Sequence, residues 1–259
     1  MKKIFESTPI LKKQFLSPEA TQWINKIQET VFLSGTVGYL KGGVLRDYIS
    51  NVYNGTNLDP KDLDIMLLGR INLVIDKLVK CGAKIKLQRN RKNTPVFELD
   101  LPTKFGLIKA DIGIILGRPS SYKKDQLIET LIKDDMNLSD FTVNTFFLPL
   151  YKPLRTLNII DYLKGIEDIR NRKVRMVTPD TFFRNPECML RAVKVADRLS
   201  SVIEPVTFKT IKKYSYLIEG APEPVINQIL CAILQSPNKR KNIELLKELG
   251  LLKYLKIKY

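Results

Sequence analysis

The chain of 259 residues is long enough for one large domain or two modest ones, and its hydrophobic content of 44% can fill a sizeable core. Its 43 Lys and Arg outnumber its 27 Asp and Glu, and the net charge of +16 favours a polyanionic partner, with nucleic acid ahead of an anionic membrane. Because there is no histidine, Ser–His and Cys–His nucleophilic sites and histidine-ligated zinc are excluded, so catalysis must use carboxylates, amines or hard metal ions.

The front of the chain alternates helix and strand patterns. SPEATQWINKIQETVF, which starts at Ser17, predicts a helix; GYLKGG predicts a short strand and a glycine turn, and VLRDYISNVY a second helix. Beyond a polar loop, LDIMLL predicts a strand and residues 72–81 a helix. The stretches AKIKLQR, PVFELDL and LIKADIGIIL indicate further strands of a sheet with one covered face.

From about Thr178 the pattern becomes helical and strand signals vanish. Apolar residues recur every three to four positions in PECMLRAVKVADRL, TFKTIKKYSYLI, PEPVINQILCAILQS and NIELLKELGLLKYL. We therefore expect an α+β protein with a boundary near Met176: a mixed-sheet domain at residues 1–176, followed by an all-helical domain at residues 177–259.

Three aspartates on predicted strands are candidate metal ligands. Alternate strand residues share a face, so Asp62 and Asp64 should project together while Leu63 and Ile65 enter the core. Asp111 lies on the polar side of LIKADIGIIL. Neighbouring carboxylates repel unless a cation lies between them, and hard oxygen ligands suit Mg²⁺. Three aspartates on adjacent strands could hold two such ions.

The glycine turn before these aspartates is a candidate phosphate site. Gly42 and Gly43 would let the backbone approach a triphosphate and offer N–H groups at a helix N-terminus. Arg46 can bind phosphate oxygens through its guanidinium fork. Alone, a Gly-Gly turn is usually only a turn and a D-x-D strand often a solvated edge; their order and proximity favour a nucleotide site.

These residues resemble the class II nucleotidyltransferases, the family of tRNA CCA-adding enzymes and bacterial poly(A) polymerases. The family's G-G-x-V-R-D and D-x-D-I motifs correspond to GGVLRD and DLDI, here with a longer intervening loop. Further matching segments follow in family order: DMNLSDFTVNTF, IIDYLKGIEDIRNRKVRMV, FRNPECMLRAVKVADRL and KNIELLKELGLLKYL.

The resemblance implies a nucleotidyltransferase head on a mixed sheet and a helical neck. It implies that an RNA 3′ hydroxyl attacks the α-phosphate of ATP, or also of CTP, and releases pyrophosphate. By position, the metal would be held by Asp62, Asp64 and Asp111, which are also the catalytic residues. The nucleotide would be bound by Gly42, Gly43 and Arg46, with Asp47 bracing the turn, and by Asp140 at the ribose, Asn144 and Arg191.

The chain departs from the family where the nucleotide base is read. Leu138 and Ser139 replace paired arginines, and the E-D-x-x-R segment becomes Arg184, Asn185 and Cys188. Asn185 can still donate and accept hydrogen bonds, but a thiol cannot replace a guanidinium. The choice between ATP alone and both nucleotides therefore stays open. The family's body and tail have no counterpart, so RNA would be held by the basic surface alone or with a protein partner.

Two main functional hypotheses follow. The first is a Mg²⁺-dependent enzyme that extends RNA 3′ ends without a template, on tRNA or as a poly(A) tail. The second is an inactive relative that binds RNA or joins a ribonucleoprotein; a nucleotidyltransferase acting on protein or an antibiotic would leave the helical motifs unexplained. The basic segment SPNKRKN, on a predicted loop, is a candidate phosphate contact, although an AT-rich genome could also explain abundant lysine.

The sequence also bears on the compartment. Cys81, Cys188 and Cys231 are far apart and lack the spacing of a zinc site, as expected for reduced cysteines of an intracellular protein. The stretch MKKIFESTPILKKQF is a poor secretory signal, and no eighteen apolar residues run together. We expect a cytoplasmic location, with an organelle or a virus-infected cell as alternatives, and no membrane contact.

Overall fold

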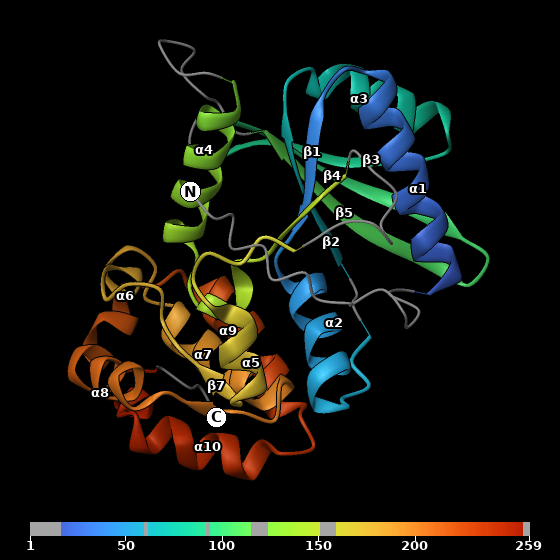
Figure 1. The fold of residues 1–259 in the computed structure, drawn as a ribbon. Helices are drawn as coiled ribbons and strands as arrows, with labels where there is room; N and C mark the ends of the chain where they lie inside the picture. Colours follow the sequence, from blue (N-terminus) through green and yellow to red (C-terminus); the bar gives the residue numbers. More distant parts are fainter. Residues whose placement is uncertain (1–16, 60–61, 92–93, 115–123, 151–158, 256–259) are drawn as a thin grey trace. The chain divides into compact units, whose positions relative to one another are not determined.

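A computed structural model describes residues 17–59, 62–91, 94–114, 124–150 and 159–255 (Figure 1). The chain divides into two compact units. The first contains the described residues up to Asp135 and those between Asn144 and Tyr162, and the second contains Met136–Val143 and the described residues from Leu163 onward. The N-terminal stretch MKKIFESTPILKKQF, a poor secretory signal by sequence, lies outside the described residues. Within them, no helix has both the length and the apolar character needed to cross a membrane.

The first unit is built on a mixed six-stranded sheet, as predicted. Its strand order is β3-β4-β5-β2-β1-β6, and the β2–β5 pair is parallel while the other pairs are antiparallel. The strands are β1 (Val37–Lys41), β2 (Asp62–Leu68), β3 (Lys84–Arg91), β4 (Thr94–Thr103), β5 (Gly106–Ile114) and β6 (Phe147–Pro149). All five strands predicted from the front of the sequence are present, and β6 is additional.

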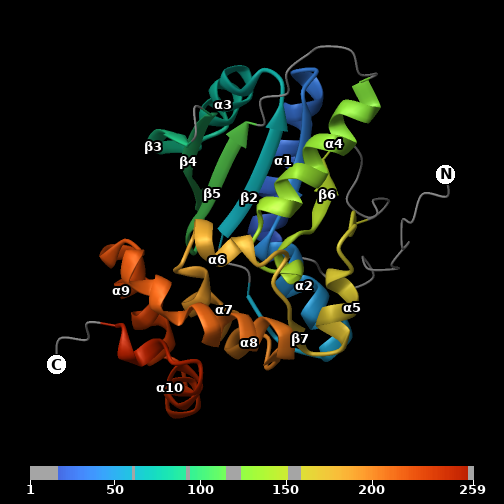
Figure 2. The same ribbon diagram turned by 90° about the vertical axis from the view of Figure 1, so that its left-hand side faces the viewer.

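Helices cover this sheet on both faces. The helices are α1 (Pro18–Leu33), α2 (Gly43–Asn54), α3 (Ile71–Lys80) and α4 (Lys124–Leu138), whose last three residues belong to the second unit. Ser17 caps α1, accepting a hydrogen bond from the Ala20 backbone N–H at 3.2 Å. In Figure 2, α1 lies behind the sheet and α4 in front of it.

The sheet core explains why the strand predictions succeeded. One row of neighbouring residues crosses four strands and is buried throughout: Leu40, Ile65, Ile112 and Phe97. These side chains share one face because opposed residues in adjacent strands point the same way. The residues one position along each strand therefore point to the other face.

The second unit is mainly helical. Its helices are α5 (Gly165–Arg170), α6 (Asp180–Arg184), α7 (Cys188–Arg198), α8 (Pro205–Tyr214), α9 (Glu223–Leu234) and α10 (Lys239–Glu248). Helix α7 packs against α9 and α10. One short parallel pair, β7 (Lys173–Val174) with β8 (Val202–Ile203), adds a strand after Thr178 that the sequence did not reveal.

Two features of the second unit bear on predicted boundaries. Phe141 forms a β-bridge with Met176, so the chain just before the boundary at Met176 packs within this unit. A functional boundary there stays a prediction, because compact packing and function need not divide a chain at the same residue.

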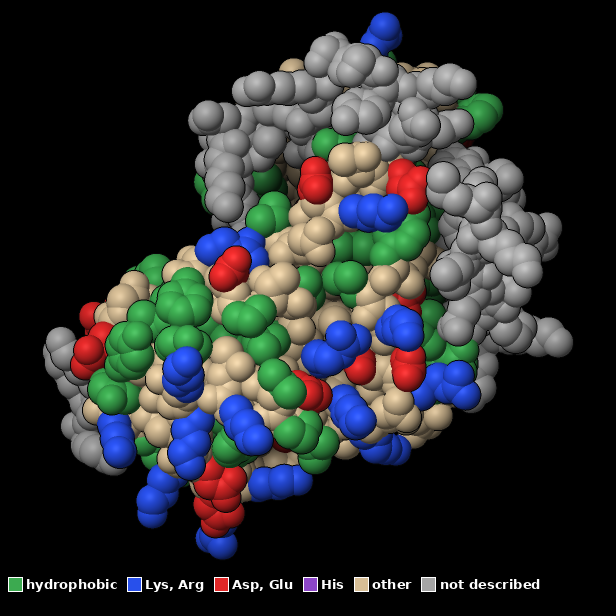
Figure 3. Space-filling view, turned by 60° about the vertical axis from the view of Figure 1, so that its left-hand side comes forward, with side chains coloured by type: hydrophobic (Ala, Val, Ile, Leu, Met, Phe, Trp, Pro, Cys, Tyr) green, Lys and Arg blue, Asp and Glu red, His purple; other side chains and the backbone are tan. Residues whose placement is uncertain are grey.

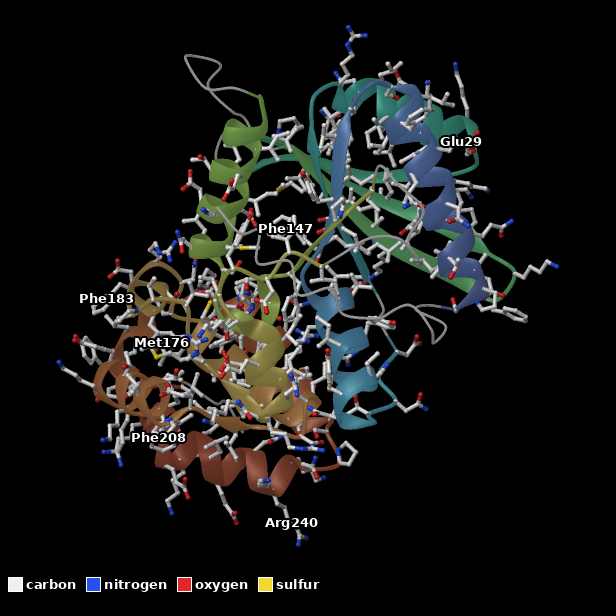
Figure 4. The ribbon with its side chains drawn as sticks, viewed as in Figure 1. Glu29, Phe147, Met176, Phe183, Phe208 and Arg240 are labelled. Carbon is white, nitrogen blue, oxygen red and sulfur yellow. The ribbon has the colours of Figure 1, made fainter. Side chains whose placement is uncertain are left out.

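The predicted loop in SPNKRKN is wrong in part: from Lys239 the segment forms the first turn of α10, and Arg240 lies on that helix (Figure 4).

Candidate active site

The polar face of the first unit's sheet carries a row of charged residues one position along from the apolar row. Asp64 on β2 lies opposite Lys41 on β1 and opposite Asp111 on β5, and Asp111 lies opposite Glu98 on β4. We name Lys41, Asp64, Asp111 and Glu98 the charged row. Asp62, two residues before Asp64, projects on the same side. Leu63 and Ile65 are buried, as predicted.

The surroundings of Asp64 disfavour the ionised form of its carboxyl group. Burial raises the pKa of Asp64 to about 6. The positive charge of Lys41 opposes that shift, the negative charges of Asp111 and Asp62 add to it, and Arg46 opposes it more weakly. A half-buried carboxylate that feels two other carboxylates is ionised at neutral pH only at a cost, which a bound cation would relieve.

The donor set fits a magnesium ion. Among the described residues, no three His, Cys, Asp or Glu side chains converge as a preformed metal cage. Mg²⁺ does not need one, since it commonly takes one or two carboxylates and completes its shell with water and substrate phosphates. Asp64 and Asp111 on adjacent strands, with Asp62 on the same face, supply such oxygen ligands.

The glycine turn lies directly against Asp64. Gly42 has φ of 74°, and its N–H donates a hydrogen bond to the Phe146 carbonyl at 3.2 Å. A Cβ atom added to Gly42 would lie 3.1 Å from Asp64 Oδ2, so a side chain here would push on the Asp64 carboxylate as well as strain the backbone. Gly43 then begins α2, and the turn brings the N-terminus of this helix beside the carboxylates.

Arg46 is held in place by two side chains of the first unit. Its Nε and Nη2 atoms donate to Asp47 Oδ1 at 2.8 and 2.7 Å, and its Nη1 donates to Asn144 Oδ1 at 2.8 Å. Asp47 is buried and accepts these two contacts from Arg46, and its expected bracing of the turn stays a prediction. The expected contacts of Arg46 and Asn144 with a nucleotide stay predictions.

The remaining predicted residues lie in the second unit. Arg191 Nη1 donates to Asp140 Oδ2 at 3.3 Å, and the other Asp140 oxygen accepts from the Phe141 N–H at 2.8 Å. Cys188 is buried next to this pair; burial, and then the charge of Asp140, raise the pKa of the thiol to about 12. Asn185, the residue that follows α6, is exposed. Nothing further is assigned to these side chains by the geometry of the unit.

Comparison with known proteins identifies the family. The family of the poly A polymerase head domain matches residues 38–175, just over half of the chain. The chain belongs to this family. Poly(A) polymerase I of Salmonella typhimurium is 29% identical over 119 residues, which cover 45% of this chain and 25% of the relative. The A-adding tRNA nucleotidyltransferase of Deinococcus radiodurans is 31% identical over 126 residues, covering 47% of the chain and 28% of the relative.

Solved structures extend the likeness of the fold. The Thermotoga maritima CCA-adding enzyme complexed with tRNA matches with a TM-score of 0.74 and 21% identity, covering 95% of this chain and 55% of that one. The chain thus spans between a quarter and just over half of the length of these relatives. At this identity the structural match establishes the fold: a nucleotidyltransferase head with a helical portion.

Sequence reasoning did not single out three charged residues at this site. Lys41 and Glu98 extend the row on either side of the two aspartates, and the Lys41 ammonium forms an ion pair with Asp135 of α4. The alternation of PVFELDL already placed Glu98 on the polar side of its strand. Strand register, which brings Glu98 next to Asp111, is not readable from either strand alone.

Proposed function

We propose that the chain is the catalytic part of a template-independent RNA nucleotidyltransferase. The observation that carries this proposal is Asp64, which lies opposite Asp111 while the Gly42 backbone packs against its carboxylate. A phosphate-binding turn and a set of ionised oxygens at one place are what nucleotidyl transfer requires. Membership in the poly A polymerase head-domain family supports the same reaction.

The proposed reaction balances simply. The 3′ hydroxyl of an RNA releases its proton to solvent as its oxygen forms a bond to the α-phosphorus of a nucleoside triphosphate. The bond between the α-phosphorus and the oxygen that bridges it to the β-phosphorus breaks, and pyrophosphate leaves with the displaced electron pair. Bound Mg²⁺, in one or two sites, would supply charge neutralisation at the phosphates and activation of the attacking oxygen. Asp62, Asp64 and Asp111 would hold it, and the backbone at Gly42 and Gly43 would orient the triphosphate.

ATP is the nucleotide that we propose as the main substrate. Relatives matched over the head are named poly(A) polymerase I and A-adding tRNA nucleotidyltransferase, and solved structures of CCA-adding enzymes hold ATP or CTP. At the positions expected to read the base, Cys188 is a buried neutral thiol and Asn185 an exposed amide. A site with one amide and no guanidinium there should discriminate between bases weakly, so CTP is a secondary candidate.

RNA 3′ ends, on tRNA or on another transcript, are the proposed acceptors. Figure 3 shows Lys and Arg side chains scattered over the viewed surface, as suits contact with a phosphate backbone. A protein partner that adds grip on the RNA, and a cytoplasmic location, stay predictions.

An inactive RNA-binding relative is the second candidate, favoured by Cys188 and by Leu138 and Ser139 in place of arginines. The charged row weighs against it. Without a cation the crowding of carboxylates around Asp64 has an electrostatic cost, which a site without chemistry could remove by one substitution.

The test is an extension assay. Purified protein is incubated with Mg²⁺, each nucleotide singly, and either a tRNA lacking its CCA end or an unstructured oligonucleotide. We expect extension with ATP, and its loss by at least about 100-fold in Asp62→Ala plus Asp64→Ala, since electrostatic stabilisation is commonly the largest catalytic contribution.

Glu29→Ala plus Asp76→Ala is the matched control. It removes the same charge from exposed positions on α1 and α3 (Glu29 in Figure 4) and should extend RNA like the wild type. If the wild type adds no nucleotide but retards RNA in a gel in a salt-sensitive way, the chain is an inactive RNA-binding relative and not an enzyme.

A further inference from the structure

Lys41 is the last residue of β1 and directly precedes the glycine turn. Its Cα lies opposite Asp64 on one side and opposite Phe147 of β6 on the other, so its side chain shares the face of the carboxylates. The ammonium lies 5.3 Å from the centre of the Phe147 ring (Figure 4) and forms an ion pair with Asp135. Lys41 therefore places a positive charge at the end of the charged row next to the turn.

Lys41 and Arg46 differ in how tightly they are held. Three nitrogens of Arg46 donate to Asp47 and Asn144, and the arginine side chain is only 12% exposed. The side chains of Lys41 and Asp135 are 27% and 24% exposed. Water reaches the lysine pair, which weakens its attraction, whereas the arginine is fixed by the fold.

The chemistry of the two cations suits different tasks. Arg46 uses three of its five N–H donors to hold Asp47 and Asn144, so it can meet a phosphate only at the place where the fold holds it. A lysine on a flexible four-carbon stem binds phosphate as a point charge and can change partner by rotating its side chain. A triphosphate carries several negative charges against the single charge of Asp135.

We propose that Lys41 is a nucleotide-binding residue whose ammonium leaves Asp135 for the phosphates of the incoming nucleoside triphosphate. The inference rests on the proposed function of the same site. It adds Lys41 as a movable phosphate contact beside Arg46, which is held in place by Asp47 and Asn144. Asp135 then competes with the nucleotide for Lys41 and limits the affinity for ATP.

The competition gives opposite predictions for the two partners. Lys41→Met should weaken ATP binding about ten-fold, the loss of one charged hydrogen bond, with Lys41→Arg retaining most of the affinity. Asp135→Asn should tighten ATP binding, because the ammonium no longer has to leave a carboxylate. If the ion pair only ties α4 to the sheet, both substitutions should lower stability alike and weaken ATP binding alike.

The measurement is the dissociation constant of ATP in the presence of MgCl₂, by calorimetry, with the thermal midpoint of each variant recorded in parallel. Lys26→Met is the matched control, since the Lys26 ammonium lies 4.3 Å from the centre of the Trp23 ring on α1 and away from the charged row. Its affinity should equal that of the wild type.

Two outcomes separate the inference from the proposed function. Equal ATP affinity in the wild type and Lys41→Met, or an affinity in Asp135→Asn that is no tighter than in the wild type, would overturn the role of Lys41 alone. A wild type that binds no ATP would overturn the nucleotidyltransferase proposal, and the inference with it. Should Lys41→Met not fold, Asp135→Asn and Lys41→Arg still decide the question.

Discussion

Asp64 in the first unit and Cys188 in the second are both ionisable groups whose pKa is raised mainly by burial. They end in opposite states. The pKa of Asp64 rises to about 6, so this carboxyl is still ionised at neutral pH, while the pKa of the Cys188 thiol rises to about 12 and the thiol stays neutral. Asp64 is thus a charged group crowded by other carboxylates, and Cys188 is a buried, neutral thiol next to Arg191.

The difference comes from the neighbours as well as from the chemistry of the two groups. Lys41 and Arg46 oppose the effect of burial at Asp64, whereas at Cys188 the charge of Asp140 adds to it and Arg191 opposes. The first unit thus maintains a charge that a cation can use. In the second unit the same physical effect yields a packing residue beside the pair of Asp140 and Arg191.

The pH dependence of the free energy of unfolding tests most directly whether Asp64 is a buried, ionised carboxylate at neutral pH. The pKa of Asp64 in the folded protein lies above the ordinary value of 3.8. The folded protein therefore binds a proton at this carboxylate more tightly than the unfolded chain does. The stabilisation from this proton is complete below pH 4 and is lost as pH rises through 6. By pH 7 the loss should reach about 3 kcal/mol in metal-free protein.

Asp64→Asn isolates this effect because the amide mimics the protonated carboxyl at every pH. Chemical denaturation without Mg²⁺ should show equal free energies of unfolding for the variant and the wild type near pH 4, and a more stable variant at pH 7. Added Mg²⁺ should narrow the difference by stabilising the wild type only. If the difference in the free energy of unfolding between Asp64→Asn and the wild type does not vary with pH, the charge of Asp64 does not destabilise the fold.

The sequence predicted the surroundings of Asp64 better than those of Cys188. Alternation in DLDIML and LIKADIGIIL put Asp62, Asp64 and Asp111 on the polar sides of their strands, and the strand register confirms that Asp64 lies opposite Asp111 on one face. The charge of Lys41 and the proximity of Glu98 depend on which strands are neighbours and in what register, and no single strand encodes that.

The second unit shows the other limit of sequence reasoning. Helical periodicity predicted its helices, but β8 has only two residues, too few for alternation to be visible. The state of Cys188 depends on burial by segments distant along the chain, which composition cannot supply. The resemblance marked position 188 as altered; the structure adds that the thiol there is buried.

Thiol reactivity tests the Cys188 side of the comparison. The exposed Cys81 and Cys231 should react with iodoacetamide at ordinary rates near pH 8. Cys188 should react at least about 100-fold more slowly, because the thiolate is the reactive form and burial disfavours it. Mass spectrometry of the alkylated protein measures the three rates separately.

Denaturant supplies the control for this prediction. In concentrated urea all three cysteines should react at similar rates, which shows that protection of Cys188 comes from the fold. Comparable rates in the native protein would mean that the thiol reaches solvent, and that the second unit offers a reactive group where we infer a packed one.

Gly42→Ala sharpens the comparison by disturbing the backbone that lies against Asp64. Gly42 has φ of 74° and ψ of −135°, outside the left-handed helical well, and an added Cβ would lie 3.1 Å from Asp64 Oδ2. We expect a loss of about 2 kcal/mol in the free energy of unfolding, combining backbone strain and this contact. ATP-dependent extension should fall further than stability does, because the turn and the carboxylate shift together.

Gly55→Ala is the matched variant at the other end of α2. Gly55 has φ of 65° and ψ of 21°, within the left-handed well, and no heavy atom lies within 4 Å of an added Cβ. Backbone strain alone should cost about 1 kcal/mol there, with extension unchanged. Denaturation and extension measured on both variants separate strain from contact with Asp64. If both variants lose extension equally, the close approach of Gly42 to Asp64 has no part in the reaction, because strain in α2 then accounts for both losses.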